Sequence, residues 1–201
     1  RSAWPGAVFL AVSIAANDAE DFAVLARRLA PYADAIELNL SCPHAHGGYG
    51  EEIGRDPERI AEVTAAVVRA IDGAVPILAK LTPNVPDIAL GATAAIDGGA
   101  SGVTAINTVG PEQYVDPVSG SVVLSNPAPQ WAVERGKEAA YRGRGGKSGR
   151  WIYDTALESV GAIRKAIGEE PIIVGMGGVE QPAQARAMRE AGADIVGIGS
   201  V

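Results

Sequence analysis

Short apolar runs with strand character alternate with amphipathic helical patterns along most of the chain, and this alternation constrains the fold most strongly. The apolar runs are continuous, which is typical of strands that are buried on both faces and therefore predicts a parallel sheet covered by helices. The predicted strands span residues 7–13, 35–40, 75–81, 102–107, 171–175 and 194–199. The predicted helices span residues 19–29, 57–71, 86–96 and 155–166, and a further helix begins at Gln181-Pro182 and stops at Gly192.

These strands, which end in polar residues or glycine, favour an α/β fold of the incomplete (β/α)8 TIM-barrel type. A doubly wound sheet is less favoured, because no strand precedes the G-x-G-x-x-G signature of dinucleotide-binding folds. We expect a single domain over residues 1–201. Residues 109–150 form a long connection without clear periodicity, which we expect to pass over the mouth of the barrel. Within it, residues 114–115 and 122–124 resemble a small hairpin around Ser119-Gly120.

Charge and cysteine content narrow the classes of partner and compartment. The net charge of -7 argues against nucleic acid or an anionic membrane as a partner. No apolar run approaches the roughly 18 residues of a membrane helix. The single cysteine, Cys42, cannot form an internal disulfide, which predicts a cytoplasmic protein. A lone cysteine also excludes an iron–sulfur cluster held by this chain alone.

The second predicted strand delivers Asn39, Ser41 and Cys42 to a glycine-rich loop that contains both histidines of the chain. Barrel enzymes build their active sites at such carboxyl ends of strands. Cys42 is therefore a candidate catalytic residue, although a lone cysteine is most often a small buried hydrophobic side chain. Together with His44 and His46 it matches no common zinc spacing, so we expect no metal.

Two further strands also end in polar side chains. Lys80 ends an otherwise apolar strand, so we expect it to have an anionic partner. Asn39 and Asn107 occupy equivalent places on their strands. An amide there either caps a loop or binds a planar hydrogen-bonding ligand, and the presence of two favours the ligand.

Glycine-rich turns end the last two predicted strands, at Gly175-Met-Gly-Gly178 and Gly197-Ile-Gly-Ser200. Their backbone N–H groups could approach a phosphate, as in many barrels, and the alternative is that they are only tight turns. The run Gly145-Gly-Lys-Ser-Gly149 is not a P-loop, because Tyr141 stands where the upstream glycine is required.

Five motifs together resemble the dihydroorotate dehydrogenase family, which includes the flavin barrel domain of dihydropyrimidine dehydrogenases. They are Glu37-Leu-Asn-Leu-Ser-Cys-Pro43, Ala79-Lys-Leu-Thr-Pro-Asn84, Gly102-Val-Thr-Ala-Ile-Asn-Thr108, Gly145-Gly-Lys-Ser-Gly149 and Gly175-Met-Gly-Gly178. The resemblance covers nearly the whole chain. It implies an FMN-dependent barrel that oxidises dihydroorotate to orotate in pyrimidine biosynthesis, with hydride transfer from ring C6 to flavin N5.

The resemblance also implies a role for each site residue. Cys42 matches the base that takes the proton from ring C5. The implied substrate-binding residues are Asn39, Ser41, His44, Asn107 and Thr108, and the implied cofactor-binding residues are Lys80, Asn107, Gly149, Gly177, Gly178, Gly199 and Ser200. Among the latter, Lys80 matches the lysine beside the flavin ring, where a cation stabilises the reduced anion.

One departure from the family keeps alternatives open. His44 stands where the dihydroorotate enzymes usually have an asparagine, and Cys-Pro-His is more similar to the dihydropyrimidine dehydrogenase domain. The alternatives are a dihydrouracil or dihydrothymine dehydrogenase subunit and, in another class, a phosphate-binding barrel without redox chemistry. Lys147 and residues 150–154 also depart from the family pattern.

The resemblance further implies a homodimer, with an iron–sulfur/FAD electron-transfer subunit as a second candidate partner. Family barrels have further strands before Ala7 and a last helix after Val201. We therefore expect residues 1–201 to belong to a longer protein, and we expect this fragment alone to hold FMN poorly.

Overall fold

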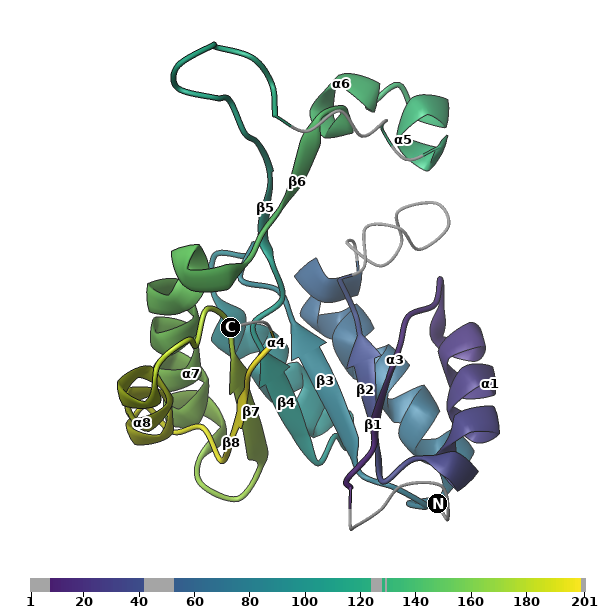
Figure 1. Ribbon diagram of the computed structural model, residues 1–201. Coiled ribbons are helices and arrows are strands. Elements are labelled where there is room, and N and C mark those ends of the chain that lie inside the picture. The colour runs from purple at the N-terminus through teal and green to yellow at the C-terminus, as the bar shows by residue number, and fades with distance from the viewer. Residues whose placement is uncertain (1–7, 42–52, 124–127, 129, 200–201) are drawn as a thin grey trace.

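The computed structural model describes residues 8–41, 53–123, 128 and 130–199. Its centre is a 6-stranded parallel sheet with the strand order β1-β2-β3-β4-β7-β8, curled like half of a barrel (Figure 1). The strands are β1 (Ala11–Ile14), β2 (Ala35–Asn39), β3 (Ile77–Leu81), β4 (Gly102–Ala105), β7 (Ile172–Met176) and β8 (Ile195–Gly197). Each of them lies within, or within one residue of, a strand predicted from the sequence.

Helices cover the convex face of this sheet (Figure 1). They are α1 (Ala19–Leu29), α3 (Pro57–Ile71), α4 (Ile88–Asp97), α7 (Tyr153–Ile167) and α8 (Pro182–Glu190). Successive members pack side by side: α1 on α3, α3 on α4, and α4 on α7. The short 3-10 helices η1 (Ala30–Tyr32) and η3 (Gly149–Ile152) adjoin α1 and α7.

Aspartate side chains fix the starts of three of these helices. Asp56 accepts hydrogen bonds from the backbone N–H groups of Glu58 and Arg59, and Pro57 occupies the first helical position of α3. Asp18 and Asp87 cap α1 and α4 in the same manner. Such caps satisfy N–H groups that have no partner within the helix. The start predicted at Asp56-Pro57 is therefore confirmed.

The two faces of the sheet differ because side chains alternate along a strand. The face under the helices is apolar and buried, with Ile36, Leu38, Ile77, Ala79, Val103, Ala105 and Ile173 in one core. The concave face carries Glu37, Asn39 and Lys80 and is partly open, and on its edge strand β8 Ile195 is 50% exposed. The described helices cover only the convex face, as expected for part of a (β/α)8 barrel, whose strands turn their other face toward the barrel interior.

An antiparallel ribbon rises from the carboxyl edge of the sheet, and it is formed by β5 (Val109–Gln113) and β6 (Arg144–Lys147) (Figure 1). The sequence did not predict these strands. The expected hairpin is confirmed at the bridge between Val115 and Val122, whereas Leu124 lies outside the described residues. Two short helices, α5 (Gln130–Glu134) and α6 (Glu138–Tyr141), lie beyond the ribbon.

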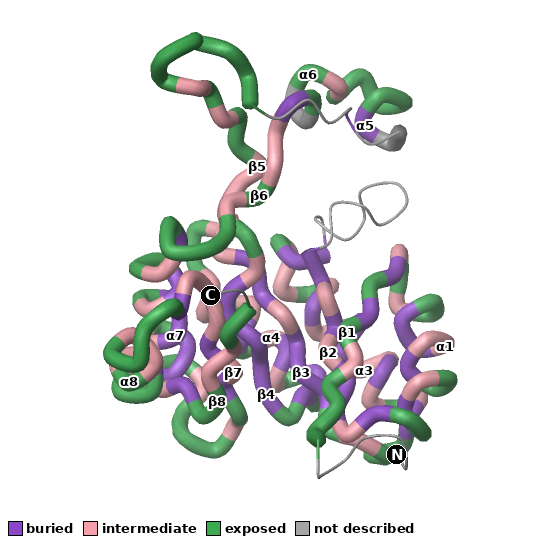
Figure 2. Tube along the Cα trace, in the orientation of Figure 1, coloured by how far each residue is buried: buried purple, intermediate pink, exposed green. Residues whose placement is uncertain are grey.

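Burial follows this division of the chain (Figure 2). Buried positions concentrate in the sheet and on the inner sides of the helices, whereas the far end of the ribbon is exposed, with Val118 at 94% exposure. Within the described part of the chain, no helix is both long enough and apolar enough to cross a membrane.

Candidate functional site

Asn39 and Asn107, which the sequence places on different strands, meet at the carboxyl edge of the sheet. The Asn107 Nδ2 group donates to Asn39 Oδ1 at 3.0 Å and to Ser41 Oγ at 2.8 Å. Asn39 ends β2 and Asn107 follows β4 by two residues, so their side chains meet across β3. The backbone N–H of Asn107 donates to the Leu81 carbonyl at 2.8 Å, which fixes its position beside β3.

Thr108 and Asn84 connect this edge to the ribbon. The backbone N–H of Thr108 donates to Asn107 Oδ1 at 2.9 Å. Asn84 donates from Nδ2 to the Thr108 carbonyl at 3.1 Å and accepts from the Gly110 N–H at 2.9 Å. Asn84 was not among the predicted site residues. The sequence feature that could have identified it is its position shortly after a strand end, in the turn Thr82-Pro83-Asn84.

Lys80 lies on the concave face next to Asn39, its register partner on β2. Its Nζ atom is 3.5 Å from Glu37 Oε1, so the anionic partner expected for Lys80 is a carboxylate of the neighbouring strand. The same oxygen accepts a hydrogen bond from Ser13 Oγ at 2.8 Å. Glu37 is the second residue that the sequence reasoning missed. Its signal was a single charge within the apolar run of residues 35–40.

A cavity of about 370 Å³ opens beside these residues at the carboxyl ends of β3, β4, β7 and β8. Its lining includes Lys80, Asn107, Gly149, Gly177, Gly178 and Gly199. These are all the predicted cofactor-binding residues that the structure describes, and they surround one space. Ser200 lies outside the described residues.

The glycines of this cavity occupy places where a side chain does not fit. Gly178 has φ +69°, and a Cβ atom there would lie 2.5 Å from the Gly149 carbonyl oxygen. Gly177 has φ +130°, and a Cβ atom there would lie 2.9 Å from Ala156 Cβ. No side chain therefore covers the backbone where the loop after β7 meets the start of η3. Glycine backbones of this kind allow N–H groups to approach a phosphate closely.

A smaller cavity of about 50 Å³ shares Asn107 and Thr108 with the large one. Its lining also includes Ser41 and Asn84. Gly146 of β6 closes one side, because a Cβ atom there would lie 2.2 Å from Thr108 Oγ1. The predicted substrate-binding residues Asn39, Ser41, Asn107 and Thr108 thus lie in one cluster, between the larger cavity and the base of the ribbon.

The remaining predicted site residues, Cys42 and His44, lie outside the described residues. Within the described ranges, the structure has no group of three or more His, Cys, Asp or Glu side chains arranged to hold a metal ion.

The sequence profile described as dihydroorotate dehydrogenase matches residues 5–201. A relative named dihydroorotate dehydrogenase B (NAD(+)), catalytic subunit, from Methanopyrus kandleri is 42% identical over 190 residues, which cover 94% of this chain and 54% of the relative. A protein of the same name from Pyrococcus horikoshii is 43% identical over 189 residues, covering 94% and 55%.

A solved structure with a similar fold is that of DHODH from Eimeria tenella in complex with ferulenol. It superposes with a TM-score of 0.68 at 18% identity, over 90% of this chain and 48% of that one. The ligand-free structure of DHODH from the same organism gives a TM-score of 0.67 at 19% identity. The chain therefore spans about half the length of the relatives it matches.

Proposed function

The chain belongs to the dihydroorotate dehydrogenase family, and from this premise we propose that it contributes the flavin and substrate sites of an enzyme that oxidises dihydroorotate to orotate. The observation that carries the proposal is the larger cavity at the carboxyl edge of the sheet. It gathers a lysine, an amide and several bare glycine backbones, and it adjoins a second cluster of amide and hydroxyl groups.

The groups that line the larger cavity suit FMN. Gly149, Gly177 and Gly178 have no side chains, so a phosphate can approach their backbone N–H groups. Glycine is required at 177 and 178, because a Cβ atom there would collide with neighbouring atoms. Lys80 also lines the cavity, and we propose that it supplies a cation to the other end of FMN, the flavin ring. The bound flavin would supply the hydride acceptor of the reaction, and the protein would supply its orientation and electrostatics.

The smaller cluster suits a flat ring with several N–H and C=O groups. The two hydrogen bonds that Asn107 donates, to Asn39 and to Ser41, hold three polar side chains in fixed positions. Preorganised hydrogen-bonding groups orient a substrate without further loss of entropy. Asn39, Ser41, Asn107 and Thr108 are therefore the proposed groups that hold the pyrimidine ring against the flavin, together with His44.

Cys42, which follows Ser41 in the chain, is the proposed base that removes the proton from ring C5. A thiol has an ordinary pKa of about 8.5, so its thiolate is a usable base near neutral pH. The proton leaves C5 to the sulfur while the hydride leaves C6, and the ring gains its double bond between the two carbons.

The names of the relatives favour dihydroorotate over dihydrouracil, and they describe a catalytic subunit of an NAD(+)-dependent enzyme. We propose that this chain works with an electron-transfer subunit that carries an iron–sulfur cluster and FAD, around a homodimer of catalytic subunits. A cytoplasmic location remains a prediction from the single cysteine.

The test is anaerobic reduction of the full-length natural protein, monitored by the flavin absorbance, with dihydroorotate and dihydrouracil in parallel. Rapid bleaching by dihydroorotate alone is expected. Bleaching by dihydrouracil alone would assign the protein to the dihydropyrimidine dehydrogenases and make His44 the marker of that substrate. A protein purified without any flavin, and unable to take it up, would contradict the proposal in both forms.

A further inference from the structure

Glu37 is a charged residue that the proposed reaction leaves without a role. It lies in the middle of β2, whose other side chains are Ala35, Ile36, Leu38 and Asn39. Its side chain is only 12% exposed. Carboxylates so largely removed from water are costly unless they are paired and hydrogen-bonded. The side chains that contact Glu37 should therefore explain why the strand contains a charge at this position.

Both partners of Glu37 come from the neighbouring strands and meet the same oxygen atom. Ser13 of β1 is its register partner and donates from Oγ to Oε1 at 2.8 Å. Lys80 of β3 lies with its Nζ atom 3.5 Å from Oε1, and the Lys80 side chain is 20% exposed. The hydroxyl of Ser13 therefore fixes the carboxylate, and the carboxylate holds the ammonium group.

Lys80 connects this group of three to the larger cavity. Its side chain lines that cavity together with Asn107, Gly177 and Gly199. A lysine has a flexible four-carbon stem, so an ammonium group without a fixed partner would sample many positions. A carboxylate next to it both restricts that motion and offsets part of its positive charge, and these two effects can be separated experimentally.

We propose that Glu37 is a positioning residue that holds Lys80 at the flavin and offsets part of the positive charge of Lys80. Ser13 fixes Glu37 in turn. This inference rests on the proposed FMN site. A bare cation beside the flavin ring favours the reduced form, which gains negative charge. The Glu37 carboxylate weakens that effect, so bound FMN is less easily reduced than it would be beside an unpaired lysine.

Glu37→Gln separates charge from position, because the Gln oxygen can still accept from Ser13 and stays next to Lys80. In the full-length FMN-loaded protein, we expect Glu37→Gln to move the two-electron reduction equilibrium about tenfold toward reduced flavin. This corresponds to a midpoint potential about 30 mV more positive, measured anaerobically against a reference dye. FMN affinity of the apoprotein should stay within about threefold of wild type, because the Gln side chain keeps the hydrogen bond from Ser13 and has nearly the same shape.

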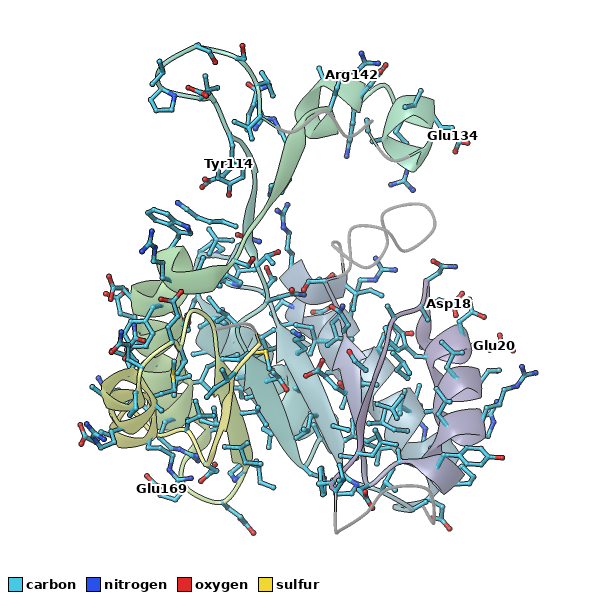
Figure 3. All side chains as sticks on the ribbon, in the orientation of Figure 1. Asp18, Glu20, Tyr114, Glu134, Arg142 and Glu169 are labelled. Atoms are coloured by element: carbon cyan, nitrogen blue, oxygen red, sulfur yellow. The ribbon has the colours of Figure 1, made fainter. Side chains whose placement is uncertain are left out.

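The matched control is Glu20→Gln, which removes the same charge from the outer surface of α1 (Figure 3). It should leave the potential unchanged. Ser13→Ala retains both charges and loses only the hydrogen bond that fixes Glu37, so it should shift the potential in the same direction by a smaller amount. In a Lys80→Gln background, Glu37→Gln should have at most about a third of its effect, because Glu37 acts through Lys80.

The outcomes distinguish this inference from the proposed function. If the wild-type protein binds no FMN, the proposed function fails before Glu37 is tested. If it binds FMN and both Glu37→Gln and Ser13→Ala leave the potential unchanged, or Glu37→Gln lowers it, the role of Glu37 is overturned and the FMN site stands. An equal shift with Lys80→Gln present would also overturn it.

Discussion

Arg164 of α7 and Asp194, which precedes β8, form an ion pair with Nη2 of Arg164 2.6 Å from Oδ2 of Asp194. Arg164 is 9% exposed, and it also donates from Nε and Nη2 to the Gly192 carbonyl and from Nη1 to the Pro171 carbonyl. Asp194 accepts in addition from the Ile173 N–H at 2.8 Å. One guanidinium thus joins α7, β7 and the loop after α8.

Arg164→Ala should destabilise the protein by about 2 kcal/mol, because the Gly192 and Pro171 carbonyls lose a charged donor and Asp194 loses its ion-pair partner. The measurement is the urea midpoint by circular dichroism. Arg186→Ala, at an exposed position of α8, is the control and should change stability by less than about 0.5 kcal/mol. Equal midpoints for the two variants would show that the Arg164 contacts contribute little.

Gly178→Ala should weaken FMN binding about tenfold or more, because its Cβ would meet the Gly149 carbonyl oxygen and push the two loops apart. The control is Gly168→Ala. Gly168 has a similar φ of +74°, but a Cβ there meets nothing within 4 Å. Both variants should lose about 1 kcal/mol of stability from the strained φ. Fluorescence titration of the apoproteins with FMN measures this, and equal affinities in the two variants would exclude a phosphate contact at Gly178.

Asn107→Ala should lower kcat/KM for dihydroorotate about tenfold or more, because Asn39 and Ser41 lose the group that holds them. Asn39→Ala should have a similar effect, and the double variant should be little worse than either, since both remove the same link. Steady-state kinetics on the four proteins gives this comparison. Fully additive losses would mean that the two amides act separately.

Cys42→Ser should slow flavin reduction by dihydroorotate about 100-fold or more at neutral pH, because a serine hydroxyl is a far weaker base than a thiolate. FMN should stay bound, so the absorbance spectrum of the oxidised protein serves as the control. Anaerobic stopped-flow reduction measures the rate. A variant that reduces its flavin as fast as the wild type would remove Cys42 from the mechanism.

Tyr153 is expected to make stability depend on alkaline pH. Its Oη atom donates to the Gln184 carbonyl at 3.2 Å, and burial, followed by the nearby Asp154 charge, raises the pKa of its phenol above the usual 10.0. The folded state therefore favours the neutral phenol, and this stabilisation is complete at neutral pH. It is lost as the pH rises through the unfolded pKa toward the higher folded one. Urea unfolding near pH 8 and above about pH 10 should show a smaller alkaline loss in Tyr153→Phe than in wild type.

The sequence predicted the sheet well because its strands are short continuous apolar runs and its helices begin at recognisable caps such as Asp56-Pro57. The ribbon was missed because Val109-Gly-Pro-Glu-Gln113 and Arg144-Gly-Gly-Lys147 contain glycine, proline and charge, which disfavour strands locally. These segments become strands by pairing with each other, as Val109 does with Lys147. Such pairing between distant segments leaves no local signal.

The same reason limited what could be predicted of the site. Asn39 and Asn107 were recognisable because each ends a strand, and parallel strands bring their carboxyl ends to one edge. The roles of Glu37 and Asn84 depend on their neighbours. The ion pair of Glu37 requires the register of β2 against β3, and the bonds of Asn84 require the path of the chain after Thr108.

The hydrogen bonds of Asn107 also give its amide a defined polarity toward any bound ring. Both of its N–H hydrogens are engaged, by Asn39 and by Ser41, so what it has left to offer is the second lone pair of its carbonyl oxygen, the first being used by Thr108. A ring can pair with that lone pair only through an N–H of its own. Methylation of the facing ring nitrogen would therefore turn a good ligand into a poor one without any change in its overall shape.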